Sequence, residues 1–198
     1  MDKTELAARV KLHELQILSD HHYTLRKAIF AYRRSDGVWQ ETARESYDIG
    51  DGAAVLPVDS ARDRVLLIKQ FRWPTFEAGY RELLIEAPAG KLDGDDPVTC
   101  VKKEALEEAG IIVTDVELFS HCFMSAGAVK ERLSLFLGRY DSTAPREKGG
   151  GHAHEGEDIE TLEVSLDQAL TMIATGEIVD SKTIMLLQAA ALRRASAP

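Results

Sequence analysis

Cysteine is scarce in this sequence: 198 residues contain only Cys100 and Cys122. Their spacing fits neither a disulfide framework nor the paired-cysteine pattern of a zinc site. Two isolated cysteines are typical of reduced, buried side chains in a cytoplasmic protein, and we expect both here.

The sequence also has little positive charge and no long apolar run. It contains 24 Lys and Arg against 33 Asp and Glu, which gives a formal net charge of -9. Since proteins that bind nucleic acid usually present a basic face, we expect no nucleic-acid partner. No apolar run approaches the length of a membrane span, and the start "MDKTELAARVKLHEL" has no signal-peptide apolar region. We therefore expect a cytoplasmic chain with no membrane partner.

The chain divides into two regions that differ in their pattern of expected secondary structure. Residues 10–48 read as extended segments around a Ser-Asp-Gly turn at 35–37, which predicts a small antiparallel sheet. Such a sheet has too little core to stand alone, so we assign residues 1–48 to a dimerisation region. Residues 49–198 form the second region, in which strands alternate with helices. This predicts an α/β (α+β) fold with a covered, mixed central sheet.

Within the second region the pattern locates further elements. "WPTFEAGY" reads as a loop, "RELLIEAPAGKL" as one strand, and "VELFSHCFM" with "RLSLFLGRY" as a strand pair. A Gly-rich polar loop follows, and loops of this length are often functional. A helix then begins at Ser165, with Gln168 completing a capping box, and ends near Gly176.

The segment "DPVTCVKKEALEEAG" carries clear helix signals. Asp96 suits the N-cap, Pro97 the first helical position and Gly110 the C-terminal end. At about 100° per residue, four apolar side chains share the face that should be buried. They are Val98, Val101, Ala105 and Ala109.

This helix also carries a cluster of glutamates. Glu104 and Glu108 lie about 40° apart at the edge of the apolar face, and Glu107 lies a little further round. Like charges at this spacing repel, so either solvent or a bound cation should compensate for the repulsion. The position beside the buried face favours the cation. Oxygen ligands without nearby His or Cys suit Mg²⁺, with Mn²⁺ as the alternative.

The segment from Gly90 to Ile111 resembles the Nudix box, G-x5-E-x7-R-E-U-x-E-E-x-G-U. "KEALEEAGI" matches its helical end, although Lys103 stands where arginine is usual and Ala105 is small for its position. Asp95 comes one residue early, so the preceding turn is one residue short. This shortened turn is similar to that of bacterial GDP-mannose pyrophosphatases, within the ADP-ribose pyrophosphatase-like branch of the Nudix hydrolases.

Further segments carry the same resemblance along nearly the whole chain. Among them are "ILSDHHYTL", "RESYDIGDGA", "VLLIKQFR", "APAGKLD", "SAGAVKE" and "GGGHAHEGEDIE". The resemblance implies a Nudix α/β/α sandwich with an added N-terminal sheet, and a homodimer. It also implies Mg²⁺-dependent hydrolysis of a nucleoside-diphosphate sugar, with GDP-mannose giving GMP and mannose 1-phosphate as the favoured reaction.

The resemblance also implies the ligands of the metal. They are the carboxylates of Glu104, Glu108 and Glu157 and the main-chain carbonyl of Ala89, while Gly90 and these neighbours border the substrate. Such a cation is also needed on charge grounds, since an acidic protein holds a diphosphate only where cations outweigh its own carboxylates.

The general base is implied to come from the Gly-rich loop, at Glu155. A solvated loop residue is the alternative for this position, and His152 and His154 beside it are more often bystanders. Glycines at 149–151 would let the loop open and close over substrate.

Substrate contacts are implied at scattered positions. Arg72 could grip a phosphate, although a surface salt bridge is an equal alternative from the sequence alone. His22 stands where the family usually offers a stacking tyrosine, and Ala43 replaces an expected basic residue. The remaining implied contacts are Arg44 and Glu45, reaching from the second subunit, with Glu131 and Lys182.

Three other functions compete with this interpretation. The first is hydrolysis of ADP-ribose to AMP and ribose 5-phosphate. The second is a Nudix fold that senses a nucleotide sugar without turnover, which would need a missing ligand. The third is a structural dimerisation module, which leaves the glutamate-bearing helix unexplained.

Overall fold

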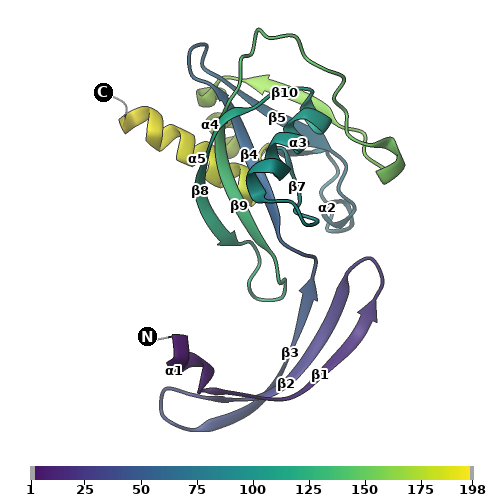
Figure 1. Cartoon of the computed structure of the whole chain (residues 1–198), viewed down its shortest axis with the longest axis vertical. Coiled ribbons are helices and arrows are strands. Elements are labelled where there is room, and N and C mark those ends of the chain that lie inside the picture. The colour runs from purple at the N-terminus through teal and green to yellow at the C-terminus, as the bar shows by residue number, and fades with distance from the viewer. Residues whose placement is uncertain (1–2, 197–198) are drawn as a thin grey trace. The chain divides into compact units, whose positions relative to one another are not determined.

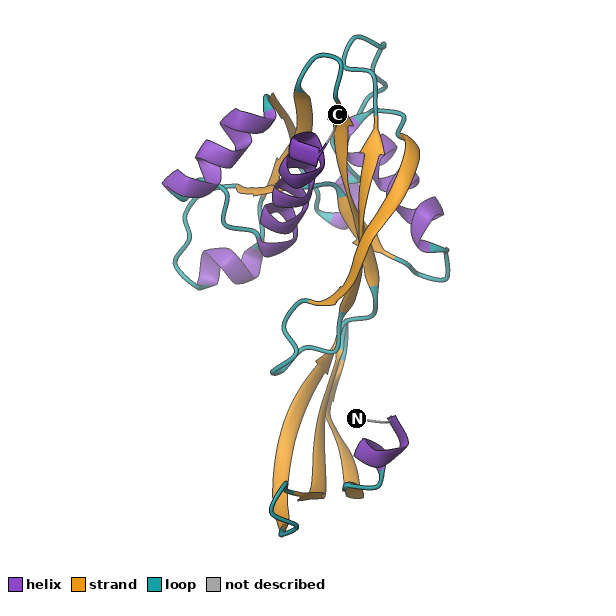
Figure 2. Cartoon of the chain, turned by 90° about the vertical axis from the view of Figure 1, so that its left-hand side faces the viewer, coloured by secondary structure: helices purple, strands orange, loops and turns teal. Residues whose placement is uncertain are grey.

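A computed structural model describes residues 3–196, apart from the side chains of residues 3, 4 and 155. The chain forms two compact units (Figures 1 and 2). One comprises Met1–Gly50 and Phe123–Glu131, and the other Asp51–Cys122 and Arg132–Pro198. From the sequence we assigned residues 123–131 to the second region, but in the structure this segment belongs to the first unit because most of its contacts lie there.

The first unit is a three-stranded antiparallel sheet in the order β1-β2-β3. Its strands are β1 (Val10–Asp20), β2 (Thr24–Arg33) and β3 (Trp39–Asp48), preceded by the short helix α1 (Lys3–Ala7). The extended segments expected over 10–48 are confirmed. Loop 123–131 joins the free edge of β3, where Tyr47 N–H donates to the Ala128 carbonyl at 2.8 Å.

This sheet has almost no core. Ala31 is the one buried apolar side chain among the described residues of the unit. Large apolar side chains of β1 are exposed instead, with Leu15 at 55% and Ile17 at 61%. The free energy of burying one side chain cannot hold a sheet together, so its apolar surface needs a further partner.

The second unit is built on a seven-stranded mixed sheet in the order β10-β5-β4-β9-β8. β4 pairs with β9 in parallel and with β5 antiparallel, while β6 and β7 add short pairs to β5 and β4. The strands are β4 (Gly52–Asp59), β5 (Arg64–Gln70), β6 (Leu84–Glu86), β7 (Ala89–Lys91), β8 (Thr114–Phe123), β9 (Arg132–Arg139) and β10 (Glu160–Val164).

Helices cover both faces of this sheet (Figure 2). On one face α3 packs over β4, β7 and β10, and on the other α5 packs over β4, β6 and β9 beside α4. The expected α/β/α sandwich with an added N-terminal sheet is confirmed. The helices are α2 (Trp73–Glu77), α3 (Pro97–Ala109), the 3-10 turn η1 (Ala153–Glu155), α4 (Leu166–Thr175) and α5 (Ser181–Ser196).

The helix boundaries follow the sequence signals. Asp96 accepts from the amides of Val98 and Thr99 at 3.0 and 3.1 Å, and Gly110 ends α3 at φ 67°. Ser165 accepts from the Gln168 amide at 3.1 Å. Local capping groups satisfy the terminal N–H groups of a helix whatever the tertiary fold, which is why these boundaries could be predicted.

Four expectations about local structure were wrong. A helix, α2, begins at residue 73 in the expected loop, where Pro74 suits a first helical turn. "RELLIEAPAGKL" forms two strands, β6 and β7, because it changes pairing partner at Ala87-Pro88, where proline cannot donate to a ladder. In the first turn of α3, Cys100 is buried and Val98 is 38% exposed. Cys122 is only half-buried.

None of the helices that the structure describes is both long enough and apolar enough to cross a bilayer.

Candidate active site

Glu108 in the last turn of α3 is a buried carboxylate. It is 2% exposed, and its Oε2 accepts the Ala89 amide of β7 at 3.1 Å. Burial raises the pKa of Glu108 well above its usual value, and the charges of Glu104 and Glu157 raise it further. The Ala89 hydrogen bond and the charge of Arg72 oppose this shift only in part. An ionised Glu108 therefore needs more positive charge than the described side chains supply.

Glu104, one turn earlier on α3, lies directly on the backbone of Gly90. A methyl group at Gly90 would come within 1.8 Å of Glu104 Oε1, so any larger residue would displace this carboxylate from its position. Strand β7 thus presents the Ala89 amide to one glutamate and the bare backbone of Gly90 to the other. Packing between α3 and β7 thus places both carboxylates against the same strand.

The Gly-rich loop brings a third carboxylate towards this end of α3. The amides of Gly150 and Gly151 donate to the carbonyls of Glu108 and Glu107 at 2.9 and 3.0 Å. Glu157 then accepts the His152 amide at 2.8 Å. The two bonds from Gly150 and Gly151 satisfy carbonyls that have no partner within the helix, so the loop also caps the C-terminal end of α3.

The glycines of this loop have a steric role that the sequence did not reveal. A Cβ at Gly149 would lie 2.7 Å from the Glu108 carbonyl oxygen, and Gly151 has φ 72° and lies against the Glu157 carboxylate. A side chain at Gly149 would therefore push the loop away from the helix, and one at Gly151 would be strained and would displace Glu157. The predicted opening and closing of the loop stays a prediction.

The donors at this site fit a divalent cation. Among the described side chains, no group of three or more His, Cys, Asp or Glu is close enough to hold a metal by itself. The predicted ligand set does not require such a group, because it includes the Ala89 carbonyl. Burial and the charges of Glu104 and Glu157 raise the pKa of Glu108, which a bound cation would offset, and hard oxygen donors are those that Mg²⁺ and Mn²⁺ prefer.

A compact basic cluster forms around Glu86 of β6, which is 2% exposed. Arg72 Nε donates to Glu86 Oε2 at 2.8 Å, and Lys182 Nζ pairs with Glu86 Oε1. Lys182 also lies 3.1 Å from Asp180, the residue before α5. Burial favours a raised pKa at Glu86, but the charges of Lys182 and Arg72 outweigh burial and lower it. Glu86 is therefore an ionised anchor that holds two cationic side chains.

Glu86 thus brings Arg72 and Lys182 together. The two alternatives for Arg72, a salt bridge and a phosphate contact, are compatible with each other in this geometry. The arginine does form a salt bridge, yet 40% of its side chain is exposed and most of its N–H donors remain for a ligand. Its charge also reaches Glu108. Glu86 was missed from the sequence, where the one available signal was a lone carboxylate within the apolar run "LLIEAP".

The remaining predicted substrate contacts belong to the first unit. Arg44 and Glu45 of β3 line a pocket of about 620 Å³ within that unit, together with loop residues 126–130. Glu131 follows this loop directly. His22 lies at the β1–β2 turn with its ring 4.4 Å from that of Tyr23, an aromatic neighbour that the sequence did not single out.

The predicted base, Glu155, has its backbone in η1, while its side chain lies outside the part of the chain that the structure describes. His152 Nε2 lies 3.4 Å from Glu107 Oε2, and the rings of His152 and His154 are 5.2 Å apart. The roles predicted for Glu155 and for the two histidines remain predictions.

A mixed sheet between helices, with clustered carboxylates on one covering helix and paired cations beside them, is an arrangement that suits hydrolysis of a phosphorus anhydride. Comparison with known families agrees. The NUDIX domain matches residues 49–187, and the GDP-mannose pyrophosphatase NudK N-terminal domain matches residues 9–47. The chain belongs to the Nudix family, and it is a Nudix pyrophosphohydrolase. Enzymes of this family generally require a divalent metal.

Curated relatives cover nearly the whole chain. The sequence is 42% identical over 189 residues to a GDP-mannose pyrophosphatase of Pectobacterium atrosepticum, covering 95% of this chain and 97% of that one. It is 41% identical over 183 residues to a GDP-mannose pyrophosphatase of Escherichia coli strain K12, covering 92% and 95%. The resemblance drawn from the sequence is confirmed.

A solved structure shows the same fold. The crystal structure of an ADP compounds hydrolase superposes with a TM-score of 0.73, covering 95% of each chain, at 12% sequence identity. At this identity the likeness concerns the fold alone.

Proposed function

We propose that this enzyme hydrolyses GDP-mannose to GMP and mannose 1-phosphate with Mg²⁺. The observation that carries this is the pairing of two features at one site: Glu104 and Glu108 against β7, and Arg72 and Lys182 on Glu86. Whole-length relatives that are GDP-mannose pyrophosphatases support the choice of substrate. Both cysteines are free, which suits a reducing cytoplasm.

In this proposal Glu104, Glu108, Glu157 and the Ala89 carbonyl hold the cation, with Gly90 lining the substrate. When bound, a divalent cation stabilises charge on the diphosphate oxygens during attack by water. Arg72 and Lys182 bind the anionic substrate from the other side. Because Glu86 fixes both cations beforehand, less side-chain entropy is lost when the substrate binds.

A panel of substrates tests the proposed activity. The full chain with Mg²⁺ is incubated with GDP-mannose, ADP-ribose and other nucleoside-diphosphate sugars, and phosphatase then releases phosphate from the products. We expect the highest kcat/KM for GDP-mannose, with GMP and mannose 1-phosphate as products. A preference for ADP-ribose would establish the alternative substrate, and binding without turnover of any compound would establish a sensor.

Glu155 is proposed as the general base. Carboxylates that hold a cation have a lowered pKa and accept protons poorly, so the acceptor should come from outside the ligand set. Replacing Glu155 by Gln should lower kcat by about 10²–10⁴-fold with little change in KM, because only a transition-state interaction is lost. Steady-state kinetics measures both constants. A loss below about tenfold would move this role to Glu107 or to a neighbouring histidine.

We also propose that the chain is a homodimer that pairs through the exposed face of the first unit. Leu15 and Ile17 lie two residues apart on β1, so both point to the same side of the sheet. Placing glutamate at both positions should convert a dimer into a monomer in light scattering after size-exclusion chromatography. Gln16→Glu, on the opposite side of the same strand, is the matched control and should stay dimeric. A monomeric unmodified chain would contradict the proposal.

If Arg44 and Glu45 contact substrate from the second subunit, the monomeric double variant should also lose activity. Full activity in a monomer would separate these residues from the substrate site.

A further inference from the structure

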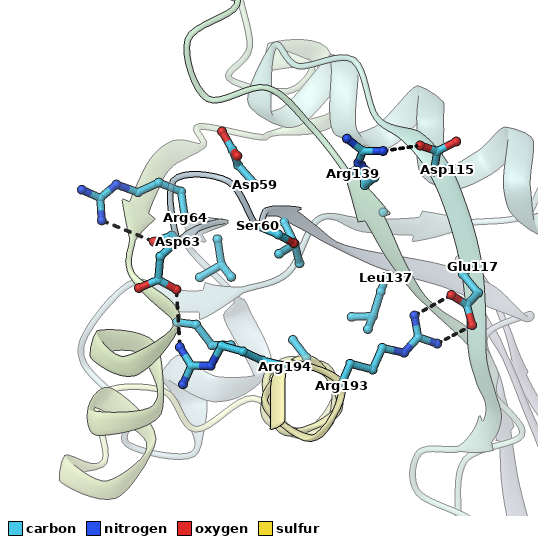
Figure 3. A pocket seen from close by; sticks show the side chains of 15 residues that line it. Asp59, Ser60, Asp63, Arg64, Asp115, Glu117, Leu137, Arg139, Arg193 and Arg194 are labelled. Atoms are coloured by element: carbon cyan, nitrogen blue, oxygen red, sulfur yellow. Dashed lines mark hydrogen bonds and ion pairs between the residues drawn. The ribbon is translucent and has the colours of Figure 1, made fainter. Parts of the chain in front are cut away.

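A cavity lies in the Nudix unit, between the last turn of α5, the β4–β5 hairpin, and strands β8 and β9 (Figure 3). Its volume is about 540 Å³. Cavities of roughly 300–1,000 Å³ are those that hold small molecules in proteins. It shares no residue with the carboxylate site or with the Glu86 cluster.

The floor of the cavity is apolar and buried. Val65 of β5, Leu137 of β9 and Ala190 of α5 are each 7% exposed or less. Leu166, at the start of α4, closes one side. This lining suits the apolar body of a ligand, which gains free energy as its surface leaves water.

Charged side chains are confined to the rim. Figure 3 shows Arg193 and Arg194 leaving the last turn of α5 in different directions. Arg193 donates to both carboxylate oxygens of Glu117 on β8 at 2.7 Å, while Arg194 pairs with Asp167 of α4 and also reaches Asp63 at 3.4 Å. Arg139 of β9 lies 3.2 Å from Asp115. These pairs are exposed and screened by solvent, so the arginines can exchange partners.

Four arginines and four carboxylates line this rim, so its formal charges balance, but the groups left unengaged are mainly N–H donors. Each guanidinium has about five N–H donors, and the ion pairs above use only one or two of them. Among the described residues, Arg64 bonds only to the Asp63 main-chain oxygen, at 3.4 Å, and to no carboxylate. Both oxygens of Glu117, in contrast, are already engaged. The hydrogen-bonding groups left on the rim are therefore mainly arginine N–H donors, which suit an anionic group of a ligand.

The cavity is separate from the proposed catalytic site. Lys182 lies in the first turn of α5 and Arg193 in the last, 11 residues further on, which is about 16 Å along a helix. A ligand here would leave Arg72, Lys182 and the glutamates uncovered.

We propose that this cavity binds a small organic anion, with an apolar body on the Val65, Leu137 and Ala190 floor and an anionic group at the arginine rim. The fluorescent probe 8-anilinonaphthalene-1-sulfonate has this chemistry. N-phenyl-1-naphthylamine, which lacks the sulfonate, is its uncharged counterpart.

The experiment titrates the ¹⁵N-labelled full chain with each probe and follows the backbone amides. The sulfonate probe should shift the amides of Val65, Gly138 and Ala190. Arg193→Gln and Arg194→Gln should each raise the Kd of the sulfonate probe at least about threefold, since a charge-assisted contact is lost at a partly exposed site. Arg132→Gln is the matched control: this arginine lies at the other end of β9, pairs with Asp51 at 2.8 Å, and should leave the Kd unchanged.

Ala190→Leu places a larger side chain in the cavity and should abolish the shifts, while the spectrum of the unliganded variant shows that it is folded. If Ala190→Leu fails to fold, the two surface arginine variants still decide the question. Shifts confined to the exposed face of β1–β3, or equal affinity for the uncharged probe, would overturn the proposal.

Discussion

Replacing Glu108 by Gln is expected to lower kcat by at least about 100-fold, because the cation that stabilises the transition state loses a buried ligand. The shape of the side chain and the hydrogen bond from the Ala89 amide are kept, so the fold should survive. Kinetics at saturating Mg²⁺ measures the loss. Glu160→Gln, an exposed carboxylate three residues beyond Glu157, is the matched control and should keep normal kcat.

The same variant has an opposite effect on stability when no metal is present. Because the folded pKa of Glu108 lies above its usual 4.5, ionising this group costs folding free energy at neutral pH. In EDTA at pH 7 the Gln variant should therefore melt at or above the temperature of the unmodified protein. The difference should vanish as pH falls below 4.5, where the glutamate is protonated in both states.

Added Mg²⁺ should raise the melting temperature of the unmodified protein and have less effect on the variant, because only a folded site binds the ion. Equal activity, or equal stabilisation by Mg²⁺, would remove Glu108 from the ligand set.

Replacing Glu86 by Gln should give the largest loss of stability. The change removes the carboxylate that Arg72 and Lys182 share and leaves Lys182 with Asp180 alone, and breaking a buried ion pair in this way costs about 3–5 kcal/mol. For a chain of this size that corresponds to a fall in melting temperature of about 6 °C or more. Glu82→Gln, an exposed glutamate in the same segment, should leave the melting temperature unchanged.

The effect of Glu86 should depend on pH. Its folded pKa is lowered below the usual 4.5, so its stabilisation is present above that pH and is lost as pH falls. The gap in melting temperature between the variant and the unmodified protein should therefore narrow in acid. A gap that stays constant down to pH 3 would show that shape, and not charge, is what Glu86 contributes. KM for substrate should rise as well, because Arg72 and Lys182 lose the group that orients them.

The sequence by itself determined the class of the protein and the positions of its main elements. The caps at Asp96 and Gly110 delimit α3 because they satisfy backbone groups locally. The spacing of Glu104 and Glu108 places two carboxylates on neighbouring positions of one helix, a consequence of helix geometry alone. These inferences needed no contact between distant segments.

Only the tertiary structure decided how the site is assembled. Glu86 joins Arg72 and Lys182, residues separated by up to 110 positions, and no local pattern records that pairing. Gly149 lies against the backbone of α3 and Gly90 against the Glu104 side chain, and both close approaches depend on packing between elements separated in sequence. Val98 was wrongly expected to be buried for the same reason: periodicity defines a face of the helix, but the neighbouring strands decide how far along the helix that face is covered.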